Sequence, residues 1–423
     1  MTADGDALAV LRTLVHDRWL PGPRPTYAGR ERRLRRFLAR ELPRAAFYAP
    51  YAGCELVDLP VVDKATVLDR FAEFNRHGIT LDRALGVATE AERTRDFSPT
   101  IDGVTVGLSS GTSGRRGVFL VSDAERRRWA GTLMAQLLDP ASVKALLRRP
   151  LRVALFLRAN SNLYETVGGG RVRFDFHDLT RPLPASLDSL SGTDVLIGPP
   201  SALRVLADLP GRLRPLQVVS VAETLEPDDR ARIAAAFGTR VEQVYQATEG
   251  LLGVSCPADR VHLNESCVHV GPEWLDQHRF VPVVTDFTRT TQYVVRYRLD
   301  DVLLADRPLD EPCRCGRPGR SVAAVLGRTG DVLDLGGVPV FADALRHAVA
   351  LVDGLDDYRI EQRGDTWHVA VRADDPDAVA TALRTEVARL ATRLAAAPPR
   401  WEPMAWPDEP ASAKRRRVRR VAA

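Results

Sequence analysis

The chain has 423 residues, of which 45% are hydrophobic and 27% charged, a composition typical of a globular protein with a sizeable core. Lys and Arg number 59 and Asp and Glu number 55, so a formal net charge of +4 excludes a surface that attracts polyanions as a whole. Five cysteines are too few for a disulfide scaffold, and we expect them as buried thiols or metal ligands in a reducing compartment.

The beginning of the chain carries early acidic residues and lacks the basic and continuous apolar regions of a secretory signal. No apolar run approaches the roughly 20 residues that cross a bilayer. We therefore expect a cytoplasmic protein that makes no contact with a membrane.

Residues 30–48 predict a helix because four apolar side chains recur on one helical face among arginines: Leu34, Phe37, Leu38 and Leu42. We expect this face to be buried and the arginines to be solvated. Residues 59–75 predict a turn followed by a second amphipathic helix.

The stretch GLSSGTSGRRGVFLVS, residues 107–122, is rich in glycine and hydroxyl side chains. Glycines let backbone amides approach an anion, and hydroxyl groups add hydrogen-bond donors, so the stretch suits a phosphate. It lacks the terminal GK[ST] of a Walker A loop. From these residues alone, a phosphate-binding loop and a flexible turn are both open.

Beyond residue 150, short apolar runs alternate with helical segments. Residues 195–197 and 218–221 suit buried strands, and a helix with Pro227 in its first turn ends at Gly238. This order predicts parallel βαβ units and therefore an α/β fold.

After about residue 325, the sequence predicts a hairpin at residues 358–373 and a helix at residues 377–397, which together form a small α+β unit. We therefore expect two domains. Residues 1–330 form a large N-terminal domain with βαβ sheets, and residues 331–423 form a small, mobile C-terminal domain.

Five further motifs follow the Ser/Gly-rich stretch in order: VAETLEP, YQATEG, VRYRLDDV, GRTGDV and ASAKRRRV. With these motifs, nearly the whole chain resembles the adenylate-forming enzymes of the acyl-CoA synthetase superfamily. Within that group it is similar to the phenylacetate-CoA ligase and coenzyme F390 synthetase branch.

The resemblance implies a ligase whose large domain binds ATP and a carboxylic acid, forms an acyl-AMP and releases pyrophosphate. The acyl group would then pass to a thiol, first of all that of coenzyme A, or to an amine. A reaction like that of F390 synthetase, AMP transfer to a hydroxyl of a deazaflavin, stays open. A catalytically inactive protein that binds a nucleotide or nucleic acid is the alternative from another class, and the joint presence of the motifs argues against it. A homodimer is common among the relatives.

The resemblance also assigns nucleotide-binding residues. The β- and γ-phosphates of ATP would be held by one loop: Ser109, Ser110, Gly111, Thr112, Ser113 and Gly114. Ala222 and Glu223 would line the adenine pocket, and Tyr245 would lie against adenine. Thr248 would contact phosphate within the catalytic centre, and Glu249 would ligate Mg²⁺, which prefers oxygen ligands.

Towards the C-terminus, Asp301 would accept hydrogen bonds from both ribose hydroxyls. Arg328 and Asp331 match the linker pair of the family, with Asp331 as the hinge. Lys414 matches the catalytic lysine, whose ammonium would stabilise charge on the attacking carboxylate and the α-phosphate.

The chain departs from the family pattern at two positions. Arg116 stands where many members have lysine, and Ala413 replaces the glycine before the catalytic lysine. The first difference bears on how the loop grips pyrophosphate, and the second on the assignment of Lys414.

Ordinary structural roles are open for the same residues. Glu249 could cap a helix, Asp301 could pair with Arg298, and Tyr245 could belong to the core. The basic run KRRRVRR could be a solvated end of the chain or a nucleic-acid patch.

The substrate pocket is expected after the apolar run that ends near residue 157. Asn160, Asn162 and Tyr164 lie where the family often builds this pocket, and they are equally suited to a turn. Polar side chains here favour a substrate with hydrogen-bonding groups over a long acyl chain.

Four residues in the sequence could hold a metal ion: Cys256, His262, Cys313 and Cys315. They supply enough ligands for a tetrahedral structural zinc site, and Cys267 is a spare candidate. The C-x-C spacing is tighter than in most zinc knuckles, and buried thiols are the alternative. Similar patterns recur in the phenylacetate-CoA ligase branch, where some members hold zinc, so the resemblance favours a structural zinc. We do not expect a catalytic zinc, because the adenylation motifs already account for the chemistry.

Overall fold

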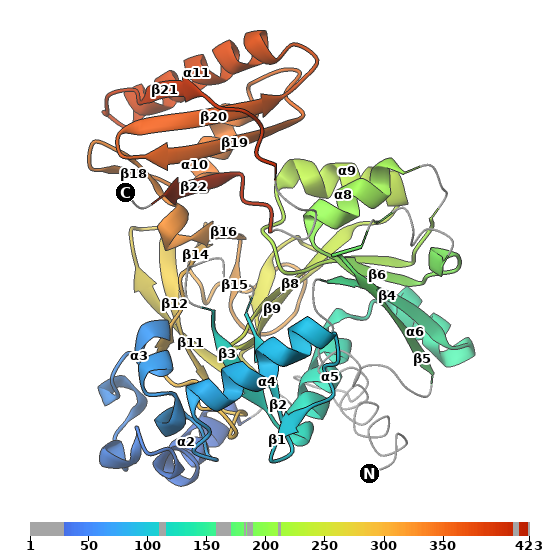
Figure 1. Cartoon of the computed structure of the whole chain (residues 1–423), viewed down its shortest axis with the longest axis vertical. Helices are drawn as coiled ribbons and strands as arrows, with labels where there is room; N and C mark the ends of the chain where they lie inside the picture. The colour runs from blue at the N-terminus through green and yellow to red at the C-terminus, as the bar shows by residue number, and fades with distance from the viewer. Residues whose placement is uncertain are drawn as a thin grey trace. The chain divides into compact units, whose positions relative to one another are not determined.

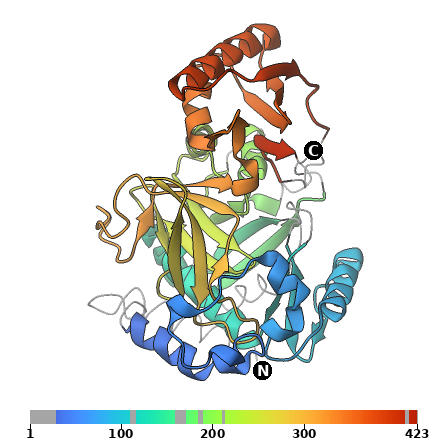
Figure 2. The ribbon, with the colours of Figure 1, turned by 90° about the vertical axis from the view of Figure 1, so that its left-hand side faces the viewer.

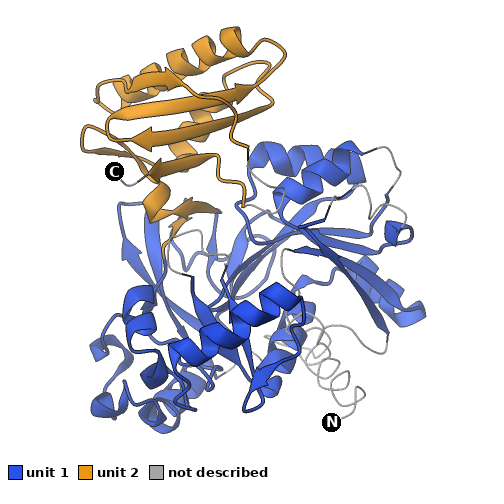
Figure 3. Ribbon diagram, in the orientation of Figure 1, with its two compact units in different colours: residues 1–299, 305–324 blue, residues 300–304, 325–423 orange. Residues whose placement is uncertain are grey.

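The computed structural model describes residues 29–109, 116–157, 171–181, 183, 189–209, 213–408 and 414–421. It divides into two compact units, of residues 1–299 with 305–324 and of residues 300–304 with 325–423 (Figure 3). The boundary expected at residue 330 therefore falls inside the second unit. The mobility expected of residues 331–423 stays a prediction.

The first unit begins with short helices: α2 Arg30–Arg40, η1 Leu42–Arg44, η2 Ala49–Tyr51, η3 Leu56–Asp58, α3 Lys64–Asp69, η4 Phe71–Phe74 and α4 Leu81–Thr94. Leu34 and Phe37 of α2 are buried, as predicted. The expectation of solvated arginines is wrong for Arg30, which binds Glu265, and for Arg33, which binds the Ser266 carbonyl. Arg30 shares the buried Glu265 carboxylate with Arg320, and Arg33 reaches the backbone carbonyl of the next residue.

A three-stranded antiparallel sheet carries the ends of the Ser/Gly-rich loop: β1 Thr100–Ile101, β2 Val104–Leu108 and β3 Val118–Val121. Apolar side chains of this sheet pack with α4 in one core. Gly107 faces Phe119 across β2 and β3, and the Phe119 ring occupies the space that a Cβ on residue 107 would need.

The main sheet of the first unit has eight strands in the order β15-β10-β9-β8-β7-β6-β4-β5 (Figure 1). Their bounds are β4 Leu151–Leu157, β5 Val172–Asp178, β6 Val195–Gly198, β7 Gln217–Ser220, β8 Val241–Ala247, β9 Gly250–Ser255, β10 Val261–Leu263 and β15 Ser321–Val322. The neighbours from β5 to β8 pair in parallel, and those from β8 to β15 are antiparallel.

Helices cover both faces of this sheet: α5 Asp123–Leu137, α6 Pro140–Arg148, α8 Pro200–Asp208 and α9 Pro227–Phe237. Successive strand residues point to opposite faces, so Val218 packs with α8 and α9 whereas Val219 packs with α5 and α6. Gly238 ends α9 with a φ of 67°, a conformation that glycine adopts without strain. The predicted βαβ units and the α/β fold are confirmed.

A smaller antiparallel arrangement completes the first unit: β11 Val268–Trp274, β12 Arg279–Asp286 and β13 Tyr297–Arg298. Strands β11 and β12 pair along their full length, and β13 adds to β12. Figure 2 shows these strands, in yellow to gold, near the middle of the view.

The second unit is an α+β structure: β14 Asp301–Leu304, β16 Ala324–Arg328, η6 Thr329–Asp331, β17 Leu333–Leu335, β18 Val338–Val340, α10 Ala342–Val349, β19 Asp357–Arg363, β20 Thr366–Arg372, α11 Pro376–Arg393, β21 Arg400–Pro403 and β22 Val418–Val421. Four strands form a sheet in the order β21-β20-β19-β22. Its apolar face packs on α10 and α11 around the fully buried Trp367. The predicted hairpin and helix are thus confirmed.

Among the described residues, no helix is long and apolar enough to cross a membrane.

The contact between Gly107 and Phe119 predicts a change in stability. In Gly107→Ala, the new Cβ would lie 2.1 Å from Phe119 Cζ, so the ring must move and the free energy of unfolding should fall by about 1–3 kcal/mol. Gly86→Ala in α4 is the control, because its Cβ would meet no described atom within 4 Å and should raise that free energy by about 0.5–1 kcal/mol. Urea denaturation measures both, and equal shifts would contradict the contact.

Candidate functional site

Residues of two predicted nucleotide-binding motifs follow neighbouring parallel strands. Ala222 and Glu223 follow β7, and Thr248 and Glu249 follow β8. Strands β7 and β8 pair in parallel, so their carboxyl ends lie at the same edge of the sheet. Ligands of open α/β sheets bind at this edge, and the structure therefore brings the two motifs together there.

The turn after β7 is conformationally strained. Ala222 has a φ of 67°, in the left-handed region that residues with a Cβ seldom adopt. The Glu223 carboxylate accepts hydrogen bonds from the backbone nitrogen and the hydroxyl of Ser201, at 3.2 and 3.0 Å, in the first turn of α8. This capping contact stabilises the turn and fixes the direction of the Glu223 side chain.

Thr248 and Glu249 form the two-residue turn between β8 and β9, where Ala247 pairs with Gly250. Thr248 Oγ1 donates to Glu249 Oε2 at 2.9 Å, and both side chains are half-buried. Because this turn joins two strands, a helix-capping role for Glu249 is wrong. Tyr245 is buried on β8, so both its adenine contact and its core role stay open.

The stem of the Ser/Gly-rich loop is closed by two hydrogen bonds. Ser109 N donates to Gly117 O at 2.8 Å, and Gly117 N donates to Ser109 Oγ at 2.6 Å. Arg116, the departure from the family pattern, binds Ser109 O and the Glu92 carboxylate. Sequence reasoning missed Lys64. Its Cε lies 3.5 Å from the position that a Cβ would take on residue 117. This places a second basic side chain at the stem.

Arg289 joins this hairpin to the Thr248 turn. Its buried guanidinium donates to Thr248 O at 2.9 Å and to Leu120 O of β3 at 3.0 Å. Gln292 completes the link, because its amide accepts from Leu120 N and donates to Val118 O. Two segments assigned to ATP by resemblance are thereby fixed to each other, although no motif included Arg289.

Glu125 supports this link from α5. Its carboxylate accepts the backbone N–H groups of Thr290 and Thr291, at 2.6 and 3.0 Å, and it closes a capping box with Ser122. Burial by itself would raise the pKa of Glu125, but the nearby Arg289 and these donors lower it overall.

The second unit holds the other assigned residues. Asp301 begins β14, Arg328 ends β16, and Asp331 ends η6. Thr329 N donates to Asp300 O at 2.7 Å, so the ribose motif and the linker motif are adjacent within this unit. Arg298 binds Glu273, and the alternative pairing of Asp301 with Arg298 stays open.

The basic run is part of the folded sheet. Residues 418–421 form β22, which pairs in parallel with β19, and Ile360 N donates to Arg417 O at 2.8 Å. Arg416 binds Asp331, and Arg419 binds Glu361. A solvated end is therefore wrong for residues 414–421, and Lys414 lies at the start of an anchored segment.

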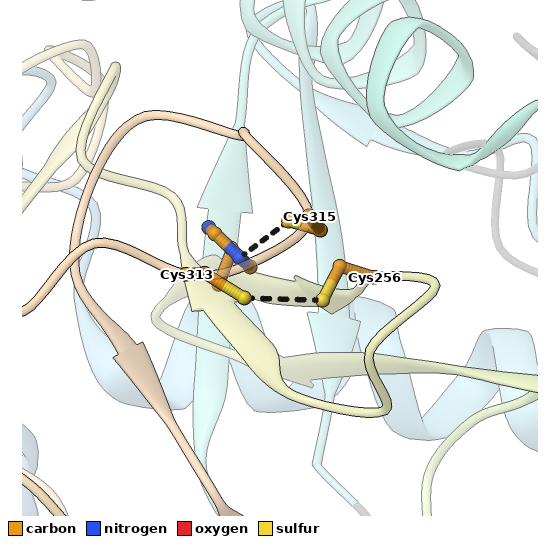
Figure 4. Close-up of side chains that lie close together, drawn as sticks. Cys256, Cys313 and Cys315 are labelled. Atoms are coloured by element: carbon orange, nitrogen blue, oxygen red, sulfur yellow. Dashed lines mark hydrogen bonds between the residues drawn. The ribbon is translucent and has the colours of Figure 1, made fainter.

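Three cysteines and one histidine of the first unit form a compact cluster: Cys256, His262, Cys313 and Cys315. Their ligand atoms all lie within 4.8 Å of one another. The sulfur atoms of Cys256 and Cys313 are 3.8 Å apart, and Cys315 Sγ is 3.3 Å from His262 Nε2 (Figure 4). Cys267, the spare candidate, is not part of the cluster.

The donor set fits a tetrahedral zinc ion. Zn–S bonds of about 2.3 Å place two sulfur ligands about 3.8 Å apart, as observed for Cys256 and Cys313. His262 Nδ1 faces Pro318 O at 3.4 Å, which leaves Nε2 directed at the thiols. Burial and the other two thiols raise the pKa of Cys315 to about 11.

The remaining site predictions lie outside the described residues. These are the loop residues Ser110, Gly111, Thr112, Ser113 and Gly114, the substrate residues Asn160, Asn162 and Tyr164, and Ala413.

No protein-family model matches the sequence, and no curated protein matches it.

The fold matches solved structures. 2-Hydroxyisobutyryl-CoA ligase, in the postadenylation state in complex with 2-HIB-AMP, matches with 15% identity and a TM-score of 0.59 over 100% of this chain and 90% of that one. The amide bond synthetase McbA from Marinactinospora thermotolerans matches with 15% identity and a TM-score of 0.52, over 74% and 67% of the two chains. ATP-bound MatB from Rhodopseudomonas palustris matches with 15% identity and a TM-score of 0.51, over 76% and 67%. The expected fold of adenylate-forming ligases is confirmed.

The lowered pKa of Glu125 predicts how stability depends on pH. A carboxyl group whose pKa is lower in the folded than in the unfolded protein stabilises the folded state. This stabilisation is fully present above the pKa of the unfolded state, about 4.3, and is lost as the pH falls through the pKa of the folded state. Glu125→Gln should lower the free energy of unfolding by about 1–3 kcal/mol at pH 7, and the difference from wild type should shrink below about pH 4. Urea denaturation across this pH range measures the effect.

The exposed Glu55 provides the control, since Glu55→Gln should change that free energy by less than about 0.5 kcal/mol at every pH. A difference between Glu125→Gln and wild type that did not change with pH would contradict the role of the ionised carboxylate.

Proposed function

We propose that the chain is an ATP-dependent ligase of carboxylic acids. A carboxylate oxygen attacks the α-phosphorus of ATP, which forms an acyl-AMP and releases pyrophosphate. A thiol or amine then attacks the acyl carbon, and AMP leaves. The fold match over the whole chain carries this proposal, because 2-hydroxyisobutyryl-CoA ligase in that match holds an acyl-AMP.

The geometry of the first unit supports the nucleotide-binding part. Ala222, Glu223, Thr248 and Glu249 follow adjacent strands at the edge of the sheet where ligands bind. Arg289 holds the loop-bearing strand β3 to the same turn. In this proposal, Tyr245 lies against adenine and Thr248 donates to phosphate. The Glu249 carboxylate would hold Mg²⁺. A bound Mg²⁺ would neutralise part of the charge of the phosphates.

Residues of the second unit act on the sugar and the reacting phosphate in this proposal. Asp301 binds the ribose hydroxyls, Arg328 and Asp331 form the linker, and rotation about Asp331 carries Lys414 away after the first half-reaction. The Lys414 ammonium stabilises charge that develops on the attacking carboxylate and the α-phosphate. The domain division and these roles rest on the motifs.

The acceptor is proposed as coenzyme A, in the manner of a phenylacetate-CoA ligase. The solved neighbours include both a CoA ligase and an amide bond synthetase, so an amine acceptor uses the same first step. Transfer of AMP to a deazaflavin hydroxyl is the second candidate, favoured only by the likeness to the F390 synthetase branch. These outcomes differ in product, because only the last retains the nucleotide.

ATP–pyrophosphate exchange with a broad panel of carboxylic acids tests the proposal. Lys414→Ala should lower the exchange rate about 100- to 1000-fold, since it removes a charge that stabilises the transition state. The matched control is Lys144→Ala, which changes an exposed lysine of α6 and should leave the rate unchanged. Mass spectrometry of the products identifies the acyl-AMP.

Exchange that survives Lys414→Ala at the rate of the control would remove Lys414 from the mechanism. Absence of exchange with every acid, together with an adenylylated deazaflavin, would replace the ligase with the second candidate. Strongly salt-dependent binding of nucleic acid without exchange would favour the non-catalytic alternative.

We also propose that the cysteine–histidine cluster binds a structural zinc ion in the cytoplasm, where thiols stay reduced. The cluster ties β9 and β10 to the loop before β15, since Cys256 follows β9, His262 lies in β10, and Cys313 and Cys315 lie in that loop. Metal bound only by the folded state stabilises it.

Removal of this metal should lower the melting temperature. A strong zinc chelator should release a single zinc ion per chain at pH 7 and lower the melting temperature, and added zinc should restore it. Cys313→Ser should lose the metal, whereas Cys54→Ser changes an exposed thiol outside the cluster and should keep it. Metal analysis by plasma emission decides, and a metal-free wild-type protein with an unchanged melting temperature would contradict the site.

A further inference from the structure

The arginines that follow Lys414 bind carboxylates on two different elements. Arg415 Nη2 lies 2.5 Å and Arg417 Nε 3.0 Å from the same oxygen of Asp357, at the start of β19. Arg416, between them, binds Asp331 at the end of η6. The run is thus anchored on both sides within the second unit.

This alternation of partners indicates an extended backbone. Successive side chains of an extended chain point to opposite sides, so Arg415 and Arg417 face Asp357 and Arg416 faces Asp331. Lys414 precedes Arg416 by two residues and falls on the Asp331 side by the same rule. Two residues span at most about 7 Å, so anchoring Arg416 keeps the backbone of Lys414 within that distance of it.

The pair between Arg416 and Asp331 is shielded and charge-balanced. The side chain of Arg416 is 28% exposed and that of Asp331 is 16% exposed, so water screens the pair less than it screens a surface ion pair. Burial, together with Arg328 and Arg419 nearby, lowers the pKa of Arg416. The Asp331 carboxylate offsets this crowding of positive charge.

We propose that Arg416 is a positioning residue whose ion pair with Asp331 ties the Lys414 segment to the hinge. The inference rests on the proposed ligase function, in which Asp331 is the hinge and Lys414 reaches the α-phosphate. The ion pair joins the hinge directly to the segment that carries Lys414. The position of the Lys414 backbone is therefore set by the hinge, although its side chain is long and flexible. Arg419 of β22 offers a contrast, since it binds Glu361 of β19 and no hinge residue among the described residues.

Kinetics of adenylate formation test the positioning, with the acid that gives the fastest exchange in the wild type. Arg416→Met should lower kcat about 10- to 100-fold, since small displacements of a catalytic group cost this much. KM for ATP should stay within about threefold, because ground-state binding is kept. Arg416→Lys should recover most of the rate, and the control Arg419→Met should stay within about twofold of wild type. Equal rates for Arg416→Met and Arg419→Met would overturn the proposal.

A double-mutant cycle assigns the effect to the pair. In an Asp331→Asn background, Arg416→Met should cause little further loss of kcat, because the partner is already neutral. Full additivity of the two losses would show that Arg416 acts through another contact and would overturn the proposal.

Hydrogen–deuterium exchange separates this inference from the ligase function. Arg416→Met should speed amide exchange in both residues 331–335 and residues 417–421, whereas Arg419→Met should speed it only in the second segment. Unchanged exchange in residues 331–335 of Arg416→Met would overturn the tether whatever the activity. If the wild type shows no ATP–pyrophosphate exchange with any acid, the ligase function fails, and this comparison alone decides whether the tether exists.

Discussion

The buried guanidinium of Arg289 is the interaction on which the candidate nucleotide site depends. A buried arginine needs hydrogen-bond acceptors, and here Nη1 reaches the carbonyl of Thr248 and Nη2 that of Leu120. These carbonyls belong to the turn after β8 and to the strand that leaves the Ser/Gly-rich loop. Glu125 supplies the compensating charge and holds the backbone beside Arg289. Two motifs more than a hundred residues apart are therefore held to each other by Arg289, with Gln292 and Glu125 supporting the link.

The second unit uses arginine and carboxylate in the same way. Asp357, Glu361 and Asp331 each bind arginines of the C-terminal run, so the repulsion within that run is balanced by acids on the sheet and η6. The planar, permanently charged guanidinium suits such fixed contacts, whereas lysine is a compact charge on a flexible stem. Only three of the 59 basic residues are lysines, and two of them are Lys414 and Lys64 at the loop stem.

Local sequence signals predicted the scaffold but not the contacts that fix the site. Pro227 and Gly238 bound a helix between two apolar runs, and those signals suffice for a βαβ unit because they act within a few residues. The role of Arg289 depends on Leu120, which lies 169 positions earlier, and no periodicity connects the two. The basic run was ambiguous for the same reason, since its partner Asp331 lies 85 positions from Arg416.

Two members of the cysteine–histidine cluster lie in a segment between two crossings of the chain from one unit to the other. The backbone leaves the first unit after Leu299, returns at Ala305 and leaves again after Ala324. Between the last two points, the only regular structure is the two-residue strand β15, too short to hold the segment by backbone pairing alone. Cys313 and Cys315 fasten this segment to β9 and β10 when a metal joins the four ligands. A metal bound there would cross-link the segment that precedes β15 to strands β9 and β10 of the eight-stranded sheet.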